Sequence, residues 1–458
     1  MEQLIELDDD VPELEEELYI PKSCLTAGQV VNLLRRMLHS LNPFYIDLAE
    51  HTAFCAIKIF ELAKSKKNLN LGIDRDNLIL LSLFFTIGAY KNDEIDLFDK
   101  DSKGSRQSNM FLYTFLFLKH LTPLDDVAEA VLFHGYSYSG AKELEFSYAE
   151  YSSLIFTCAR FCVELQKNNY VFNESILSSE FIKECSSLYN PIYVDLFLEA
   201  NKNGEITKEF QSGNYFSLLD EYCNSLKLNY DDTFSLLKML IYTIDFISTS
   251  TVTHVISTAF HATEICKLEN LSDSETDEVF TAAVIHDFGK LDVDVNILES
   301  SERLSESDME KMRCHVKSGM KICEGIVSQK IADIAFRHHE ALDGSGYPLG
   351  LTEKDLSVQQ RILAVADIFS ALTDARTYKP SFPKEKTIGI LESMSSKNKI
   401  DSKIFADVKN NYDDIILQTQ KRRPMLITNL GYVLVDYMQL KKYETLPDLI
   451  TAIRQSSS

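Results

Sequence analysis

The sequence predicts an all-α protein with two helical domains in tandem. Apolar residues recur at helical spacing from Thr26 onward, for example at Val30, Leu34 and Met37. Segments with β-branched residues at every second position are scarce. Similar helix-like runs then follow one another in the same order in both halves of the chain. With 458 residues, the chain is long enough for two or three domains, each with its own core.

The composition is that of an ordinary globular protein, with 45% hydrophobic and 25% charged residues. No stretch of about 18 apolar residues is present, and the N-terminus is acidic where a secretory signal would be basic. We therefore expect a cytoplasmic protein with no membrane segment. The 9 cysteines include no CxxC pair, which favours reduced thiols over a disulfide or zinc framework.

The formal net charge is −23 at pH 7. Proteins that bind nucleic-acid polymers neutralise phosphates with clustered Lys and Arg, so this charge argues against that class. A small anionic substrate would need a local cationic feature, such as metal ions together with a few basic residues.

Changes in composition along the chain predict five segments. They are an acidic N-terminal arm (1–25), a first helical domain (26–215), a linker (216–235), a second helical domain (236–411) and a C-terminal extension (412–458). Within the extension, the basic triplet Lys421–Arg423 is followed by Pro424, which favours a solvated turn.

The first domain contains a helix-like run that begins at His51, followed by the apolar run Leu80–Ala89. The same layout recurs in the second domain at His254 and Ala282–Lys290. Where the second copy has His286, Asp287 and Lys290, the first copy has Phe85, Thr86 and Ala89. We interpret this as an internal duplication whose first copy has lost its ligands. Two unrelated helical domains that merely look alike are the alternative left open here.

Potential metal ligands are concentrated in the second domain. The adjacent pair His286-Asp287 follows an apolar run and is closed by Gly289, and Asp367 lies inside another apolar helix-like run, where burial without a partner is costly. The whole set is His254, His286, Asp287, His315, His338, His339 and Asp367. It exceeds what one tetrahedral ion needs, so we expect two divalent ions with Asp287 as the bridging ligand.

Imidazole and carboxylate ligands suit iron or manganese, with zinc or nickel less favoured. Two such ions activate a bridging water as hydroxide and stabilise the oxygens of an in-line displacement at phosphorus. The ligand set therefore indicates phosphoester hydrolysis.

Three motifs resemble those of the HD-GYP domain family, a branch of the HD phosphohydrolase superfamily. The segment His286–Lys290 (HDFGK) matches HDxGK, and His338–Pro348 (HHEALDGSGYP) matches HHExxDGxGYP. The segment Arg361–Lys379 (RILAVADIFSALTDARTYK) matches the helix that follows. The resemblance covers residues from about 236 to 411, whereas the first half resembles the family only faintly, as a degenerate copy.

The resemblance implies a phosphodiesterase that hydrolyses cyclic di-GMP to pGpG or GMP. It implies that Asp287 and Lys290 are catalytic and that the seven residues above bind metal. Substrate contacts would come from Lys290, Arg376, Lys379, Gly344 and Tyr347. It also implies a signalling partner, such as a diguanylate cyclase, at the GYP loop, and we expect a homodimer that uses the ligand-free copy.

Some members of the family carry a glutamate four residues before the first histidine and hold a third ion. This chain has Ser250 there, which favours two ions. His261 is taken as structural. Two alternatives remain open at this stage. One is a cyclic dinucleotide receptor or interaction scaffold with little turnover, and the other is a hydrolase of a different cyclic dinucleotide.

Overall fold

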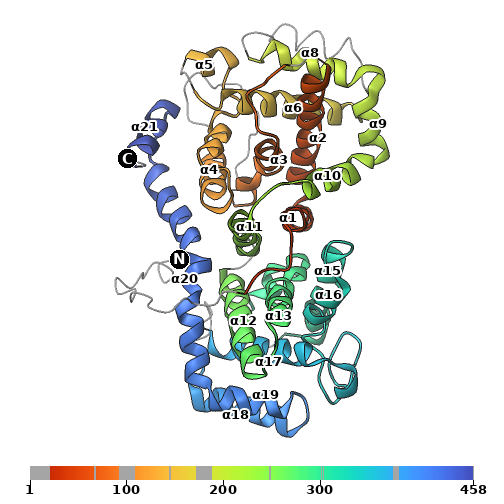
Figure 1. The fold of residues 1–458 in the computed structure, drawn as a ribbon, viewed down its shortest axis with the longest axis vertical. Helices are drawn as coiled ribbons and strands as arrows, with labels where there is room; N and C mark the ends of the chain where they lie inside the picture. The colour runs from red at the N-terminus through yellow and green to blue at the C-terminus, as the bar shows by residue number, and fades with distance from the viewer. Residues whose placement is uncertain are drawn as a thin grey trace. The chain divides into compact units, whose positions relative to one another are not determined.

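The computed structural model of the chain describes residues 21–66, 69–91, 109–143, 146–171, 188–246, 249–300, 302, 304–374 and 381–456. Within these ranges the helices and 3-10 helices make up the regular structure, and Asp343 and Thr352 form an isolated β-bridge (Figure 1). No helix in the described ranges has the length and hydropathy that a membrane crossing requires. The predicted all-α class is confirmed.

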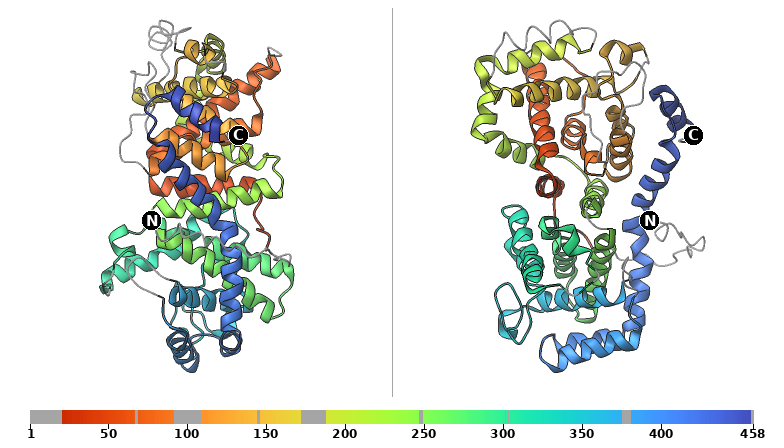
Figure 2. Two further views of the ribbon diagram at one scale, coloured as in Figure 1. Left: turned by 90° about the vertical axis from the view of Figure 1, so that its left-hand side faces the viewer. Right: turned by 180° about the vertical axis from the view of Figure 1, so that it is seen from behind.

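The chain forms two compact units. Unit 1 consists of residues 1–40 and 237–431, and unit 2 consists of residues 41–236 and 432–458. Their limits fall inside three helices, α1 (Ala27–Leu41), α11 (Tyr230–Thr243) and α20 (Tyr412–Leu440). The predicted domain limits differ from these, because α1 belongs almost entirely to unit 1. The predicted linker 216–235 is mostly helical, and α20 runs without interruption through the predicted turn at Pro424 (Figure 2).

Unit 1 contains the second predicted domain. After η5 (Ile244–Phe246), its helices are α12 (Thr249–Leu268), α13 (Asp273–Ile285), η6 (Phe288–Asp292), α14 (Val295–Leu298), α15 (Glu306–Cys323), α16 (Gln329–Ala335), η7 (Glu353–Asp355), α17 (Val358–Thr373), α18 (Lys384–Ser396) and α19 (Ser402–Asn410). The core includes Ile265, Val365 and Phe369, which belong to one cluster of buried residues shared by α12, α17 and their neighbours. Helix α12 packs against both α13 and α17.

Capping residues fix where the main helices of unit 1 begin. Ser272 and Glu275 form a capping box at the start of α13, and Ser357 and Gln360 form another at the start of α17. In each box, the serine hydroxyl and the longer side chain accept from backbone N–H groups that have no partner within the helix. The caps thereby set the register of the two helices that carry His286 and Asp367.

The predicted solvated turn at residues 421–424 is wrong. Arg422 lies on α20 with 3% of its surface exposed and forms an ion pair with Glu264 of α12. A proline lacks the N–H that a helix interior uses, yet α20 continues past Pro424, whose carbonyl accepts from the Thr428 hydroxyl at 2.7 Å.

Unit 2 contains the first copy. Its helices are α2 (Pro43–Lys66), α3 (Arg75–Phe84), η2 (Ile87–Tyr90), α4 (Asn109–Leu121), η3 (Asp125–Phe133), α5 (Tyr138–Glu143), α6 (Ala149–Lys167), α8 (Pro191–Ala200), η4 (Lys202–Gly204), α9 (Glu205–Ser212), α10 (Asn214–Asn224) and α21 (Leu446–Ser456).

The two units repeat one pattern of helix contacts. In unit 2, α2 packs on α3 and α6, and η2 packs on α4; in unit 1, α12 packs on α13 and α17, and η6 packs on α15. A glycine makes the closest approach in both. A Cβ on Gly88 would overlap the Met110 carbonyl of α4, and a Cβ on Gly289 would overlap the His315 carbonyl of α15. The tandem arrangement predicted from the sequence is therefore present in the structure.

Candidate metal centre

Helices α12 and α17 bring together two of the predicted ligands. His254 and Asp367 are 3% and 8% exposed, and the Nε2 of His254 lies 3.0 Å from the Oδ1 of Asp367. The capping box at Ser357 fixes where α17 begins. The packing of α12 against α17 then places His254 and Asp367 next to each other.

The His286-Asp287 pair lies at a turn between two helices. Helix α13 ends at Ile285, His286 is its C-cap, and Asp287 is the N-cap residue of η6. Because Gly289 has no side chain, η6 can lie directly on α15 at His315. The turn therefore presents both side chains toward the helix that carries the next ligand.

Three histidines share one hydrogen-bonding arrangement. The Nδ1–H groups of His286, His315 and His338 donate to carbonyl oxygens three residues earlier, at 2.7, 2.7 and 2.6 Å. A carbonyl can only accept, so Nδ1 carries a proton, and in the neutral form of each ring the lone pair is on Nε2. All three Nε2 atoms are buried and lack a hydrogen-bond partner among the described residues. Metal-binding histidines are held in this way by an outer partner.

The ligand atoms form two groups. In one, His254, His286 and Asp287 offer atoms that all lie within 4.8 Å of one another, and in the other His315, His338 and His339 do the same. Asp287 faces both groups. Its Oδ2 lies 3.3 Å from the Nε2 of His286, and its Oδ1 lies 3.7 Å from the Nε2 of His315.

Asp367 also reaches both groups. Its Oδ1 is 3.8 Å from the Nε2 of His286, and its Oδ2 is 3.9 Å from the Nδ1 of His339. The structure thus brings together all seven residues that the sequence predicts as metal ligands. The donor set of nitrogen and oxygen atoms, with buried lone pairs that have no other partner, fits divalent ions.

The charges differ between the two groups of ligands. Burial lowers the pKa of His338 well below its usual range, and it lowers the pKa of His339 to about 4 despite the opposing carboxylate of Asp367. Both rings are therefore neutral at neutral pH, as metal binding requires. Burial also disfavours charge on His286, but Asp287 and Asp367 outweigh it and raise that pKa to about 10. Without an ion, an imidazolium thus partly balances the buried carboxylates.

Lys290 lies beside Asp287, with its Nζ 2.5 Å from the Oδ2 of Asp287. Burial raises the pKa of Asp287, but His286 and then Lys290 outweigh burial and hold it well below its usual range. Two other predicted phosphate contacts, Arg376 and Lys379, lie outside the described residues, as does the side chain of Ser250.

The two predicted substrate contacts of the loop, Tyr347 and Gly344, have different surroundings. The ring of Tyr347 lies 4.7 Å from the ring of His339. Gly344 has a φ of +78° in a turn, where its N–H donates to the carbonyl of Ala341 at 2.9 Å. Its contact with substrate stays a prediction. His261 lies in the core with its Nδ1 3.0 Å from the hydroxyl of Ser370, in keeping with a structural role.

Glu340 is a residue of this site whose role the sequence did not reveal. It is 5% exposed, and its two carboxylate oxygens accept from the N–H groups of Leu349 and Leu351 at 2.6 and 2.9 Å. It therefore closes the loop that follows the histidine doublet. The available signal was a glutamate directly after two ligand-type histidines and before a glycine-rich turn.

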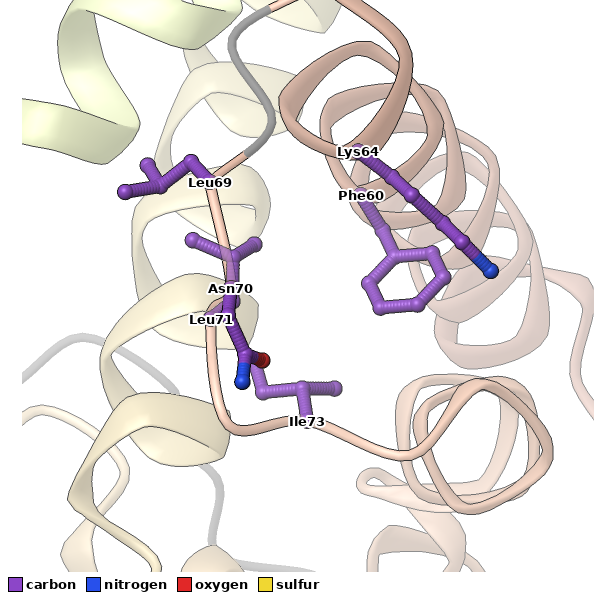
Figure 3. Close-up of a pocket in the computed structure, with 6 residues that line it drawn as sticks. All are labelled: Phe60, Lys64, Leu69, Asn70, Leu71 and Ile73. Atoms are coloured by element: carbon purple, nitrogen blue, oxygen red, sulfur yellow. The ribbon is translucent and has the colours of Figure 1, made fainter.

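A separate pocket of about 260 Å³ lies in unit 2, between α2 and the segment that leads to α3 (Figure 3). None of the predicted site residues lines it. Lys64 is the one titratable side chain among its lining residues, which are Phe60, Lys64, Leu69, Asn70, Leu71 and Ile73. These residues do not indicate a catalytic function for the pocket.

Comparison with known proteins places this geometry in a family. Residues 239–404 match the family model described as "HD domain". The cyclic di-GMP phosphodiesterase response regulator RpfG of Xanthomonas campestris pv. campestris is 38% identical over 124 residues, which are 26% of this chain and 33% of that protein. A cyclic di-GMP phosphodiesterase of Thermotoga maritima is 32% identical over 184 residues, 39% of this chain and 50% of that protein.

A 3′3′-cGAMP-specific phosphodiesterase 3 of Vibrio cholerae is 33% identical over 167 residues, 36% of this chain and 36% of that protein. The chain therefore spans half or less of the length of these relatives. The crystal structure of a cyclic GMP-AMP-specific phosphodiesterase from V. cholerae (V-cGAP3) matches with a TM-score of 0.51 and 18% identity, over 85% of this chain and 98% of that one. At this identity the likeness shows the fold. From the family model, the relatives and the motifs together, the second half of this chain carries an HD domain of the HD-GYP type.

Proposed function

We propose that this protein is a metal-dependent phosphodiesterase that hydrolyses a cyclic dinucleotide, with cyclic di-GMP as its substrate. The observation that carries the proposal is the convergence of three buried imidazole Nε2 atoms, those of His286, His315 and His338, near the carboxylates of Asp287 and Asp367. His286 and Lys290 balance part of the buried negative charge, but the Nε2 atoms of His315 and His338 have no partner among the described residues, and unpartnered buried polar atoms are costly.

The ligand groups indicate how two divalent ions, iron or manganese, would be held. His254, His286 and Asp367 would serve one ion, His315, His338 and His339 the other, and Asp287 both. Bound ions would supply Lewis-acid activation of a water molecule and of the phosphate oxygens. The number and identity of the ions remain part of the proposal.

The side chains of this domain have separate tasks in the proposed reaction. The carbonyl contacts of His286, His315 and His338 keep each ring in one tautomer and one orientation. Lys290, whose side chain is 22% exposed, lies next to the bridging carboxylate. It can move from Asp287 to a substrate phosphate once an ion has taken over the charge of Asp287. Burial of the ligands excludes bulk water from the reacting centre.

The names of relatives favour a second candidate substrate. Several matching proteins of V. cholerae are described as 3′3′-cGAMP-specific phosphodiesterases, whereas others are described as cyclic di-GMP phosphodiesterases. Both substrates are cyclic purine dinucleotides with two phosphodiester linkages, so the same metal centre suits either. The predicted homodimer and the predicted signalling partner at the loop of Tyr347 also remain proposals.

The direct test is turnover by full-length protein purified without oxygen, with iron and manganese quantified in the same sample. Cyclic di-GMP, 3′3′-cGAMP and cyclic di-AMP are compared at equal concentration. We expect about two ions per chain and hydrolysis of cyclic di-GMP that a chelator abolishes. If the protein binds two ions and binds the nucleotide tightly but does not hydrolyse it, the protein is a receptor and not an enzyme. If the protein binds no ion, the proposed metal centre is wrong.

A further inference from the structure

A row of side chains in contact leads from the candidate metal centre to the surface of unit 1. The ring of His315 lies 5.2 Å from that of His339, which lies 4.7 Å from the ring of Tyr347. The guanidinium carbon of Arg313 then lies 5.4 Å from the centre of the Tyr347 ring. Arg313 is exposed and belongs to α15, two residues before the ligand His315. It therefore stands at the solvent end of a row whose inner end is a ligand group.

The position of Tyr347 within this row is set by the backbone. Its N–H donates to the carbonyl of His339 at 3.1 Å. The buried carboxylate of Glu340 holds the N–H groups of Leu349 and Leu351 on the far side of the loop. A Cβ on Gly346 would overlap the backbone of Ala341, so the loop closes tightly just before the tyrosine. These contacts fix the position of the Tyr347 ring, against which the guanidinium of Arg313 lies.

The hydrogen-bonding capacity of Arg313 is not used within the described part of the chain. There its recorded contact is the Tyr347 ring, and it has neither a hydrogen bond nor an ion pair. A guanidinium over a ring uses its face for that contact and keeps its N–H groups at the edge. Two other arginines of unit 1 differ in this respect, because Arg337 pairs with Asp333 and Arg361 with Asp401.

We propose that Arg313 is a specificity-determining residue that reads the edge of a guanine base of the bound cyclic dinucleotide. The inference rests on the proposed function and deepens it. Arginine has only donors, and guanine offers two adjacent acceptors, O6 and N7, which the planar fork matches. Adenine has an amino donor in place of O6, so it forms at most one of these two hydrogen bonds. Arg313 therefore favours dinucleotides that contain guanine over cyclic di-AMP.

The competing interpretation is that Arg313 contacts a phosphate, as a surface cation would. Lys317 is also exposed on α15, one turn further along, so a basic patch is a real alternative. The two roles differ in what they predict for a panel of substrates. A phosphate contact lowers affinity for every dinucleotide equally, because all carry the same phosphates. A base contact changes the ratio between guanine and adenine substrates.

The test is kcat/KM for cyclic di-GMP, 3′3′-cGAMP and cyclic di-AMP, measured on full-length, metal-loaded protein. The variants are Arg313→Gln, Arg313→Lys and, as a matched control with the same loss of charge on the same helix, Lys321→Gln. We expect Arg313→Gln to lower the preference for cyclic di-GMP over cyclic di-AMP by about 10-fold or more, the scale of one bidentate base contact. Arg313→Lys keeps the charge but loses the fork, so its preference also falls. Lys321→Gln keeps the original preference.

The outcomes separate this inference from the function on which it rests. If the unaltered protein hydrolyses cyclic di-GMP and Arg313→Gln lowers kcat/KM for all three substrates by one factor, Arg313 is a phosphate contact and the inference is overturned. An unchanged ratio and unchanged kcat/KM overturn it as well. If the unaltered, metal-loaded protein hydrolyses none of the three, the proposed function itself fails, and the specificity role fails with it.

Discussion

In unit 1 the turn after α13 carries His286 and Asp287, whereas in unit 2 the equivalent turn after α3 carries Phe85 and Thr86. Each turn is followed by a glycine that lies against a helix further along the chain, α15 in unit 1 and α4 in unit 2, and both turns lie in the same order of packed helices. The two units therefore share this arrangement of packed helices, but they differ in the side chains at its centre.

The centre of unit 2 is filled by aromatic rings. The ring of His134, which follows η3 as His338 follows α16, lies 5.0 Å from Phe85, 4.9 Å from Phe111 and 5.1 Å from Phe156. Burial lowers the pKa of His134 to about 3, so this ring is neutral. In unit 2, apolar packing thus stabilises the same arrangement of helices without a set of metal-ligand residues among those described at its centre. The buried carboxylates and imidazole nitrogens of unit 1 therefore need another explanation, which the proposed ions would provide.

The largest expected effect comes from removing the bridging ligand. Asp287→Asn should lower metal content and reduce turnover by about 10³-fold or more, because metal ions contribute several kcal/mol to such reactions. The matched control is Thr86→Ala at the equivalent position of unit 2, which should keep both metal content and turnover. Ion content is measured on the same samples as activity. An Asp287→Asn protein that retains both ions and activity would show that the centre has been misplaced.

A smaller effect is expected from the two equivalent glycines. Gly289→Ala and Gly88→Ala each force a methyl group into a backbone carbonyl of the facing helix, and overpacking of this kind costs about 1–3 kcal/mol. Hydrogen exchange should report faster opening of α15 in the first variant and of α4 in the second. Only Gly289→Ala should also lose metal. Equal loss of metal in both variants would contradict the division of roles between the units.

The third expected effect, comparable in size to that of the glycine variants, is a dependence of stability on pH that originates in unit 2. His134 takes up a proton near pH 6.5 in the unfolded chain but only at about pH 3 in the folded one. Acidification therefore favours unfolding, and between pH 7 and pH 5 this group lowers the stability of unit 2 by roughly 2 kcal/mol. Hydrogen exchange of α4 and α6 at both pH values measures the change. His134→Leu should reduce this change but not abolish it, because burial also lowers the pKa of His51 in unit 2 to about 4. An unchanged pH response would refute the contribution of His134.

The ligand set could be predicted from the sequence because its members lie in long, ordered motifs. His286 to Lys290 and His338 to Pro348 fix residue types and spacing, and the helical period places Asp367 on a buried face. The structure brings these side chains together, although their roles as ligands stay a prediction. The repeated layout was also visible, because Phe85 and Thr86 occupy the place of the ligand pair in an otherwise similar run, and its origin by duplication stays a prediction.

Other features depend on contacts that no local pattern encodes. Arg422 looked solvated beside Lys421 and Pro424, but its partner Glu264 lies on α12, far away in the sequence. A buried ion pair of this kind follows from tertiary packing and not from helix propensity. The assignment of α1 to unit 1 also depends on contacts between residues far apart in the sequence. For example, the side chain of Arg36 on α1 donates to the carbonyl of Ile322 at 3.1 Å.

The carbonyl contacts of His286, His315 and His338 have a consequence for metal selectivity. Each ring is oriented by the backbone of its own helix, so little side-chain freedom remains to be lost when an ion arrives. A preorganised cage of this kind cannot adjust its spacing to each ion. If ions bind here as proposed, ions of unsuitable radius or coordination geometry would fit less well, because the backbone fixes the orientation of these three rings.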